Sequence, residues 1–293
     1  MKQDLVEAVI VPPLRDLGDG FTVRRALPSA HRRMVGPFIF LDELGPITLV
    51  GDQALDVRPH PHIGLATITH LIAGEIMHRD SLGSVQAIRP GAVNWMTAGR
   101  GIVHSERSPV AARGVGAALH AVQLWVALPA AKEEMAPAFH HHPAHTLPVA
   151  EDRGARLALL AGEACGMVAP VAATSDMILA ELILDAQARY AFAAMHIERA
   201  VYVVSGAIRV EGQEGSFAAG QLVVLKPGAP VVLAADQASR LMLVGGEPFP
   251  EPRQVFWNFV SSRPDRIEQA KADWREGRFD AVPDEDEFIP LPP

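Results

Sequence analysis

Apolar residues come in short runs along almost the whole chain, and each run is closed by turn residues. Gly and Pro number 24 each and are spread over the full length. Apolar runs of about 4–8 residues between such turns predict β-strands. The runs lie at 66–76, 91–99, 120–129, 155–163, 177–185, 199–212, 220–228, 231–236 and 240–248. Regular alternation of strand and turn, without long helical segments, predicts an all-β sandwich or barrel.

Two stretches of the chain share one layout. Residues 66–100 contain a strand, a Gly-containing turn, a second strand and the turn Arg89-Pro90-Gly91. Residues 199–235 repeat this order and contain Lys226-Pro227-Gly228. We interpret the two stretches as an internal duplication, that is, two similar β-domains in tandem.

The regular pattern stops in the Pro- and His-rich segment 137–150, PAFHHHPAHTLPVA. A change of composition of this kind is typical of a boundary between domains. We therefore predict an N-terminal domain over 1–136, a linker over 137–150 and a C-terminal domain over 151–293.

One helix interrupts the β pattern near the C-terminus. Ile267, Ala270 and Trp274 recur at i, i+3 and i+7 within 266–277, with Pro264 near the start and Gly277 at the end. This punctuation is typical of a helix. We expect the helix to pack across the C-terminal domain. The acidic, Pro-rich tail DAVPDEDEFIPLPP is expected to run as an extended strap.

Composition narrows the class of protein. The 293 residues are 49% hydrophobic and carry a net charge of −8, with no run of Lys or Arg. An acidic surface argues against direct binding of nucleic acid. The one cysteine, Cys165, excludes an intrachain disulfide and a cysteine-based zinc site. No secretory signal is recognisable, and no window reaches the roughly 18 apolar residues of a membrane span. We expect a cytoplasmic protein without a membrane partner.

The strongest chemical signal is a pair of short motifs, His60-Pro-His62 and His104-Ser-Glu106. Side chains alternate along a strand, so each motif places two ligand groups on one face. Three imidazoles and one carboxylate can converge from two strands. Such ligands suit first-row divalent metals, namely iron, copper, zinc, nickel, cobalt or manganese. The motifs predict a mononuclear metal site with open positions for chemistry.

Other histidines compete for this role. His70 and His78 lie in the strands after the first motif, and His120 precedes a strand that carries Trp125. We expect a packing role or a supporting role behind the ligands for His70, and a core or rim position for His120. The group His140, His141, His142 and His145 is interpreted as an exposed loop cluster.

The segment HPHIGLATITHLIAGEIMHRDSLGSVQAIRPGAVNWMTAGRGIVHSE (60–106) resembles the signature of the pirin family, within the cupin superfamily. Segments 36–46, 119–129 and 256–279 fit the same pattern. The resemblance covers nearly the whole chain. It implies a bicupin, with two tandem cupin domains in one chain, of which the N-terminal one holds a single metal, typically Fe(II). The metal ligands of the family match His60, His62, His104 and Glu106.

Two departures from the family pattern limit what the resemblance implies. Many pirins carry Glu four residues after the second His of the first motif, where this chain has Ala66. This difference puts the family's substrate preference in doubt. In the second repeat, Met195-His196-Ile197-Glu198 stands where a metal-binding cupin carries two histidines. We therefore expect the C-terminal cupin to be metal-free.

The resemblance implies two different functions. Some pirins oxidise the flavonol quercetin with O₂, and here Glu106 is the candidate proton acceptor. Phe38, Phe40, Trp95, Met96 and Trp125 are candidates to line the flavonol cavity, if they are not simply core. Other members act without catalysis, as metal- or redox-sensing proteins that regulate a partner protein. An enzyme acting on another enolisable small molecule is a third possibility, and a monomer is the favoured state.

Overall fold

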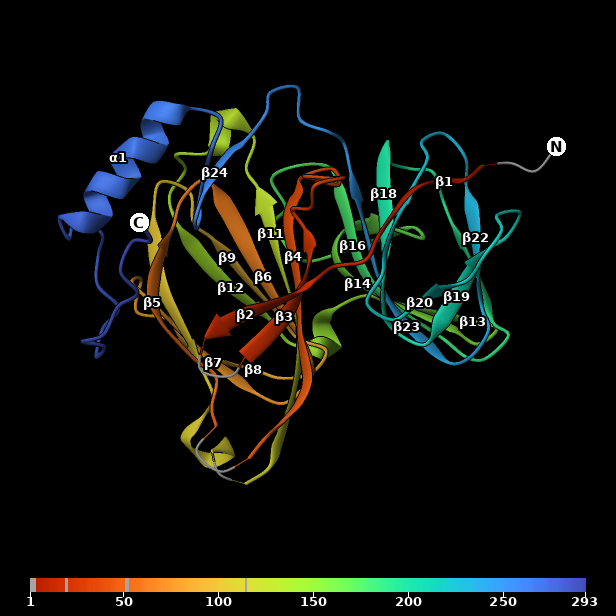
Figure 1. Ribbon diagram of the computed structural model, residues 1–293, viewed down its shortest axis with the longest axis horizontal. Helices are drawn as coiled ribbons and strands as arrows, with labels where there is room; N and C mark the ends of the chain where they lie inside the picture. The colour runs from red at the N-terminus through yellow and green to blue at the C-terminus, as the bar shows by residue number, and fades with distance from the viewer. Residues whose placement is uncertain (1–3, 19–20, 51–52, 114) are drawn as a thin grey trace. The chain divides into compact units, whose positions relative to one another are not determined.

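The computed structural model describes residues 4–18, 21–50, 53–113 and 115–293 of the chain (Figure 1). Residues 1–3, where the predicted N-terminal domain begins, lie outside the described residues. The described residues form 25 strands and one α-helix, so the predicted all-β class is confirmed. Three short 3₁₀ turns occur at Val110–Ala112, Ala130–Lys132 and Ala144–Thr146.

The chain forms two compact units whose segments interleave along the sequence. We call the first the N-terminal unit; it comprises Leu17–Phe21, Leu44–Ala144 and Pro250–Pro293. The second, the C-terminal unit, comprises Met1–Asp16, Thr22–Glu43 and His145–Phe249.

The predicted boundaries 1–136, 137–150 and 151–293 differ from this division. The predicted linker contains β12 (Ala138–His142), which pairs with β9 (Val93–Thr97) as a regular strand. The helix and the tail belong to the N-terminal unit. The reason is that strands from one end of the chain complete sheets built from the other half, as when β1 (Val6–Ile10) pairs with β21 (Leu222–Leu225).

Two sheets build the part of the structure that carries the predicted metal motifs. A seven-stranded sheet has the order β12-β9-β6-β11-β4-β3-β2. Its remaining strands are β6 (Leu65–Ala73), β11 (Ala117–Ala127), β4 (Phe38–Leu49), β3 (Phe21–Leu27) and β2 (Leu14–Gly18). A four-stranded sheet has the order β5-β10-β7-β8. These strands are β5 (Asp56–His62), β10 (Ile102–Arg107), β7 (Ile76–Asp80) and β8 (Val85–Ile88).

The C-terminal unit repeats this arrangement. Its large sheet has the order β1-β21-β18-β23-β16-β14-β13, and β15 pairs with β14. The strands are β18 (Glu198–Ser205), β23 (Ser239–Gly246), β16 (Met177–Leu184), β14 (Ala155–Ala164), β13 (Val149–Asp152) and β15 (Met167–Val168). Its small sheet has the order β17-β22-β19-β20. These strands are β17 (Arg189–Phe192), β22 (Val231–Ala235), β19 (Ala207–Val210) and β20 (Phe217–Ala218).

The two strand orders correspond position by position, so the predicted duplication is confirmed. Gly74 after β6 and Gly206 after β18 occupy equivalent turns, with φ of 92° and 83°. The Pro-Gly turns that suggested the repeat are not equivalent, however. Arg89-Pro90-Gly91 precedes β9, whereas Lys226-Pro227-Gly228 follows its counterpart β21. Pro and Gly favour a turn in any connection and do not identify which one.

The C-terminal segment covers the open edge of β5. Strand β5 contains Pro59 and Pro61, and proline lacks the N–H that an internal strand needs, so β5 lies at the sheet edge. The backbone N–H of Val260 donates to the Ile63 carbonyl at 3.2 Å, and that of Ile289 donates to the Pro59 carbonyl at 2.8 Å. These contacts shield an edge that would otherwise be free to pair with another chain.

Helix α1 (Pro264–Arg275) packs in the N-terminal unit, so the expectation that it crosses the C-terminal domain was wrong. Its buried residues Ile267 and Ala270 form one cluster with Ile63 and Phe259. Phe259 lies in the hairpin of β24 (Gln254–Phe256) and β25 (Phe259–Ser261), which precedes the helix. The apolar stripe was predicted correctly, but the sequence did not show which surface it covers. The tail beyond the helix is extended, as expected.

Candidate metal centre

Three histidines from two adjacent strands meet in the N-terminal unit. Strands β5 and β10 are antiparallel neighbours, and His104 lies opposite His60 in their register. His60 and His62 share a face of β5 because they are two residues apart. The ligand nitrogens of His60, His62 and His104 all lie within 4.8 Å of one another. The three side chains are 7%, 1% and 1% exposed.

The ring nitrogens of this group are available to a cation. His60 Nδ1 lies 2.9 Å from the Arg58 carbonyl, which can only accept, so Nδ1 carries the proton and Nε2 keeps its lone pair. Among the described residues, no group makes a well-aligned hydrogen bond within 3.5 Å to either nitrogen of His62 or to His104 Nε2. Unpaired polar atoms in a buried place are costly, and a bound metal is one of the ways to satisfy them.

Burial keeps these imidazoles neutral. Burial lowers the pKa of His62 and of His104 well below 6.5, and the neighbouring imidazoles lower it further. The pKa of His60 is also lowered by burial, against the opposing effect of its bond to the Arg58 carbonyl. Because a histidine must be neutral to bind a metal, the donor set fits a divalent cation.

A second pair, His78 and Asp80 on β7, orients His104. His104 Nδ1 lies 3.4 Å from His78 Nδ1, and His78 Nε2 lies 2.9 Å from Asp80 Oδ2. His78 Nε2–H donates to the carboxylate, so His78 Nδ1 can accept a hydrogen bond from His104 Nδ1–H, which leaves His104 Nε2 for a metal. The ring of His78 also stacks on Phe139, with centroids 4.2 Å apart.

Asp80 is held as a carboxylate. Burial alone raises its pKa, but hydrogen bonds from His78 and Ser84 outweigh burial and lower the pKa below 3.8. Sequence reasoning assigned no role to this pair. The signal was present, since His78 and Asp80 have the same i, i+2 spacing as the two ligand motifs.

Glu106 points to the same side of β10 as His104 but is held differently. Its Oε1 accepts a hydrogen bond from Thr69 Oγ1 at 2.8 Å, and its Oε2 accepts one from Gln123 Nε2 at 3.1 Å. Thr69 and Gln123 are paired on the adjacent strands β6 and β11. Glu106 is not part of the group whose ligand atoms lie within 4.8 Å of one another. Its role as fourth ligand therefore stays a prediction.

The aromatic candidates separate onto different faces. Trp125 contacts the His62 ring with centroids 5.2 Å apart. Met96 pairs with Thr67, two residues before Thr69, and so lies on the metal side of the sheet. Trp95 has the opposite orientation; it is buried and donates to Thr97. The other two candidates, Phe38 and Phe40, belong to the C-terminal unit.

The remaining histidines do not join the three imidazoles. His70 follows Thr69 on β6, so it faces the other side, where its Nδ1 lies 3.2 Å from the Ala92 carbonyl. His120 is buried at the start of β11, in agreement with a core position. The expected loop cluster at 140–142 is instead the strand β12, in which His141 donates to Asn94 Oδ1 at 2.7 Å.

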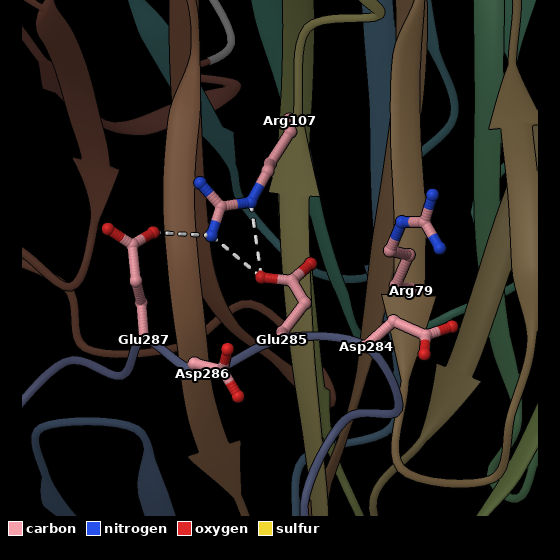
Figure 2. Close-up of a pocket in the computed structure, with 6 residues that line it drawn as sticks. All are labelled: Arg79, Arg107, Asp284, Glu285, Asp286 and Glu287. Carbon is pink, nitrogen blue, oxygen red and sulfur yellow. Dashed lines mark hydrogen bonds and ion pairs between the residues drawn. The ribbon is translucent and has the colours of Figure 1, made fainter.

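The C-terminal strap, residues 280–293, contacts the face of β10 that points away from the three imidazoles. Residues Ser105 and Arg107 alternate with His104 and Glu106, so they face away from the metal side. Ser105 Oγ donates to Glu285 at 2.5 Å, and Arg107 Nη2 lies 2.7 Å from the other Glu285 oxygen. Figure 2 shows Arg107 held between Glu285 and Glu287.

A hollow of about 470 Å³ opens at the strap. It is lined by Arg79, Arg107, Asp284, Glu285, Asp286 and Glu287 (Figure 2). None of the predicted ligands lines it.

Among the described residues, no helix is both long and apolar enough to cross a membrane.

Comparison with known proteins shows which family the chain belongs to. Residues 20–126 match the family model described as Pirin, and residues 179–280 match the model described as Pirin C-terminal cupin domain. A pirin-like protein of Caulobacter vibrioides is 47% identical over 294 residues, covering 98% of this chain and 100% of that protein.

Two solved structures show the same fold. A quercetin 2,3-dioxygenase from Acinetobacter baumannii is 37% identical, with a TM-score of 0.89 and coverage of 98% of this chain and 95% of that one. The bacterial pirin YhhW from Escherichia coli, in complex with nickel(II), has a TM-score of 0.65 at 18% identity, covering 81% and 96% of the two chains. At that identity the second likeness concerns the fold alone.

Proposed function

The chain belongs to the pirin family, and from this premise we propose that its N-terminal unit is a mononuclear metal centre that oxidises a flavonol-like substrate with O₂. The observation that carries the proposal is that three buried imidazoles lie together, and that among the described residues neither nitrogen of His62 nor Nε2 of His104 has a hydrogen-bond partner. The likeness to a protein named as a quercetin 2,3-dioxygenase supports the substrate class.

His60, His62 and His104 would hold the metal through neutral nitrogens, with Glu106 as the fourth ligand. Histidine and carboxylate ligands suit first-row metals, of which we propose Fe(II), with copper, manganese, nickel, cobalt and zinc as alternatives. When bound, any of these ions would supply a Lewis acid for the enolic hydroxyl of the substrate, and a redox-active ion such as Fe(II), unlike zinc, would also supply an electron-transfer partner for O₂.

Glu106 is the residue we propose as proton acceptor. Thr69 and Gln123 hold its two oxygens at 2.8 and 3.1 Å, which restricts its position beside the imidazoles. Once it loosens from the ion, the carboxylate would accept the proton of the flavonol 3-hydroxyl, so that the substrate binds as an anion. Trp125 and Met96 are buried apolar residues on the same side, and they would help to exclude water from the centre.

The test is reconstitution of the chelated protein with Fe(II), and separately with the other ions. We expect quercetin loss and O₂ consumption in equal amounts, and loss of both with His62→Ala. His145→Ala, an exposed histidine of the chain, is the matched control and should retain full activity. Turnover no faster than free metal with every ion refutes the dioxygenase.

The same experiment separates the two functions. Stoichiometric metal binding that depends on His62, without turnover of quercetin, favours the alternative of a non-catalytic metal- or redox-sensing protein. Glu106→Gln tests the fourth ligand independently. If this variant keeps stoichiometric metal at unchanged affinity, Glu106 is not a ligand, whatever the reaction.

A further inference from the structure

A buried histidine lies beside two carboxylates at one end of the eight-stranded sheet of the C-terminal unit. Met177 at the start of β16 pairs with Gly246 at the end of β23. Asp176 immediately precedes the first of these residues and Glu247 immediately follows the second, so the two acids flank the same sheet end. His196 lies in the connection that leads into β18.

The three side chains are close enough to share one cation. Their ligand atoms all lie within 4.8 Å of one another. His196 Nδ1 is 3.7 Å from Asp176 Oδ1, which is too long for a hydrogen bond. Glu247 is held in place, because its Oε1 accepts the backbone N–H of Ile197 at 3.2 Å.

His196 is the observation that distinguishes this group from an ordinary acidic cluster. Its side chain is 5% exposed, and neither ring nitrogen has a hydrogen-bond partner in the described part of the chain. Imidazoles in such places are normally paired. The Asp176 side chain is 70% exposed, so the group is open to solvent on the side of that acid.

We propose that Asp176, His196 and Glu247 form a second divalent-cation site, suited to Zn²⁺. One imidazole nitrogen and two carboxylates are ligands that Zn²⁺ binds, and the two negative charges balance the ion. Water can complete the coordination on the exposed side. The site differs from the expected cupin position, because the counterparts of His60 and His104 in this unit are Phe192 and Val231.

The experiment counts Zn²⁺ in the full-length chain with the first site removed. In the His62→Ala background, the chelated protein is titrated with Zn²⁺ alone against a chromophoric chelator. We expect about one equivalent at the second site. Loss of a ligand's supporting partner costs 10–100-fold in affinity, so loss of a direct ligand should weaken binding by more than about tenfold.

Three variants test the individual ligands in that background, namely His196→Ala, Asp176→Asn and Glu247→Gln. His31→Ala removes an exposed histidine of the same unit and should leave the affinity unchanged. Asp176→Asn preserves shape at an exposed position, so it decides the matter even if His196→Ala does not fold. Unchanged Zn²⁺ affinity in Asp176→Asn, or no bound equivalent in the background protein, overturns the proposal.

Discussion

The two units have the same strand order but opposite interiors. In the N-terminal unit, β5 and β10 carry His60 facing His104. In the C-terminal unit, the equivalent strands β17 and β22 carry Phe192 facing Val231. Phe192 and Val231 belong to a continuous apolar core. One backbone arrangement therefore supports either a polar centre or a packed core, and a few side chains decide which.

The large sheets differ in the same way, with polar residues in the N-terminal unit and apolar residues at the counterpart positions of the C-terminal unit. Thr69 and Gln123, which hold Glu106, are paired across β6 and β11. Their counterparts across β18 and β23 are Val201 and Leu243, both fully buried. The N-terminal unit thus has polar residues both at the predicted ligand positions and at the positions that hold Glu106, and the C-terminal unit has apolar residues at both.

Arg199 is a fully buried charged residue of the C-terminal unit, and its removal should have the largest effect. Its guanidinium donates to the carbonyls of Phe192, Ala193, Lys226 and Ala229 at 2.7–3.3 Å, and the residue is 0% exposed. Arg199→Met leaves these carbonyls without a donor. We expect a loss of about 3–5 kcal/mol in the free energy of unfolding, measured in urea.

The matched variant is at the counterpart position, Thr67, which sits at the equivalent place on β6. Thr67→Ala removes one hydroxyl and should cost about 1 kcal/mol. If Arg199→Met costs no more than Thr67→Ala, the arginine does not hold the C-terminal unit together, and its interior is simply a hydrophobic core.

The interiors should also respond differently to pH in the metal-free protein. The pKa values of His60, His62 and His104 are lowered by burial, so below about pH 6.5 the unfolded chain binds more protons than the folded one. Stability therefore falls as the pH drops from 6.5 toward the folded pKa values. Each histidine can contribute about 1.4 kcal/mol per pH unit over that window.

His104→Val introduces the residue type found at the counterpart position, Val231. It should therefore reduce the difference in pH response between the two units. We expect the variant to lose less stability than the wild-type chain between about pH 7 and pH 5, when both are unfolded in urea with a chelator present. An equal loss in both proteins would show that acid sensitivity originates outside the three imidazoles.

The sequence predicted the features that depend on residues close together along the chain, and it missed those that depend on contacts between distant segments. Period-2 spacing and turn residues are local, so the strands, the duplication and the pairs His60/His62 and His104/Glu106 were predicted. The pairing of β5 with β10 that brings the imidazoles together followed from the motifs. Contacts across the fold, such as Phe139 on His78, depend on which strands become neighbours, and the sequence did not show this.

The predicted boundaries differ from the observed division into units for the same reason. Segment 137–150 is rich in Pro and His, yet its backbone pairs with β9, and composition does not report pairing. The helix showed its apolar stripe but not its partner, which includes Ile63 beside the metal motif. Residues 195–198 were expected at the cupin position of the second repeat, but they follow β17, and Phe192 at the end of that strand faces Val231.

The smallest expected effect concerns the C-terminal strap, which contacts the strand β10 in the N-terminal unit. Arg107 is paired with both Glu285 and Glu287, at 2.7 and 2.9 Å (Figure 2). The first carboxylate is 7% exposed and also accepts from Ser105, whereas the second is 61% exposed. The two acids have the same partner but differ in burial.

Glu285→Ala should therefore cost about 1–3 kcal/mol in the free energy of unfolding, because it leaves Ser105 and Arg107 without their buried acceptor. Glu287→Ala should cost less than about 1 kcal/mol, as exposed ion pairs do, and salt should erase its effect. Both are measured by urea unfolding at low and high salt. Equal costs would mean that both acids act as exposed ion pairs, and that the contact of Glu285 with β10 adds no further stability.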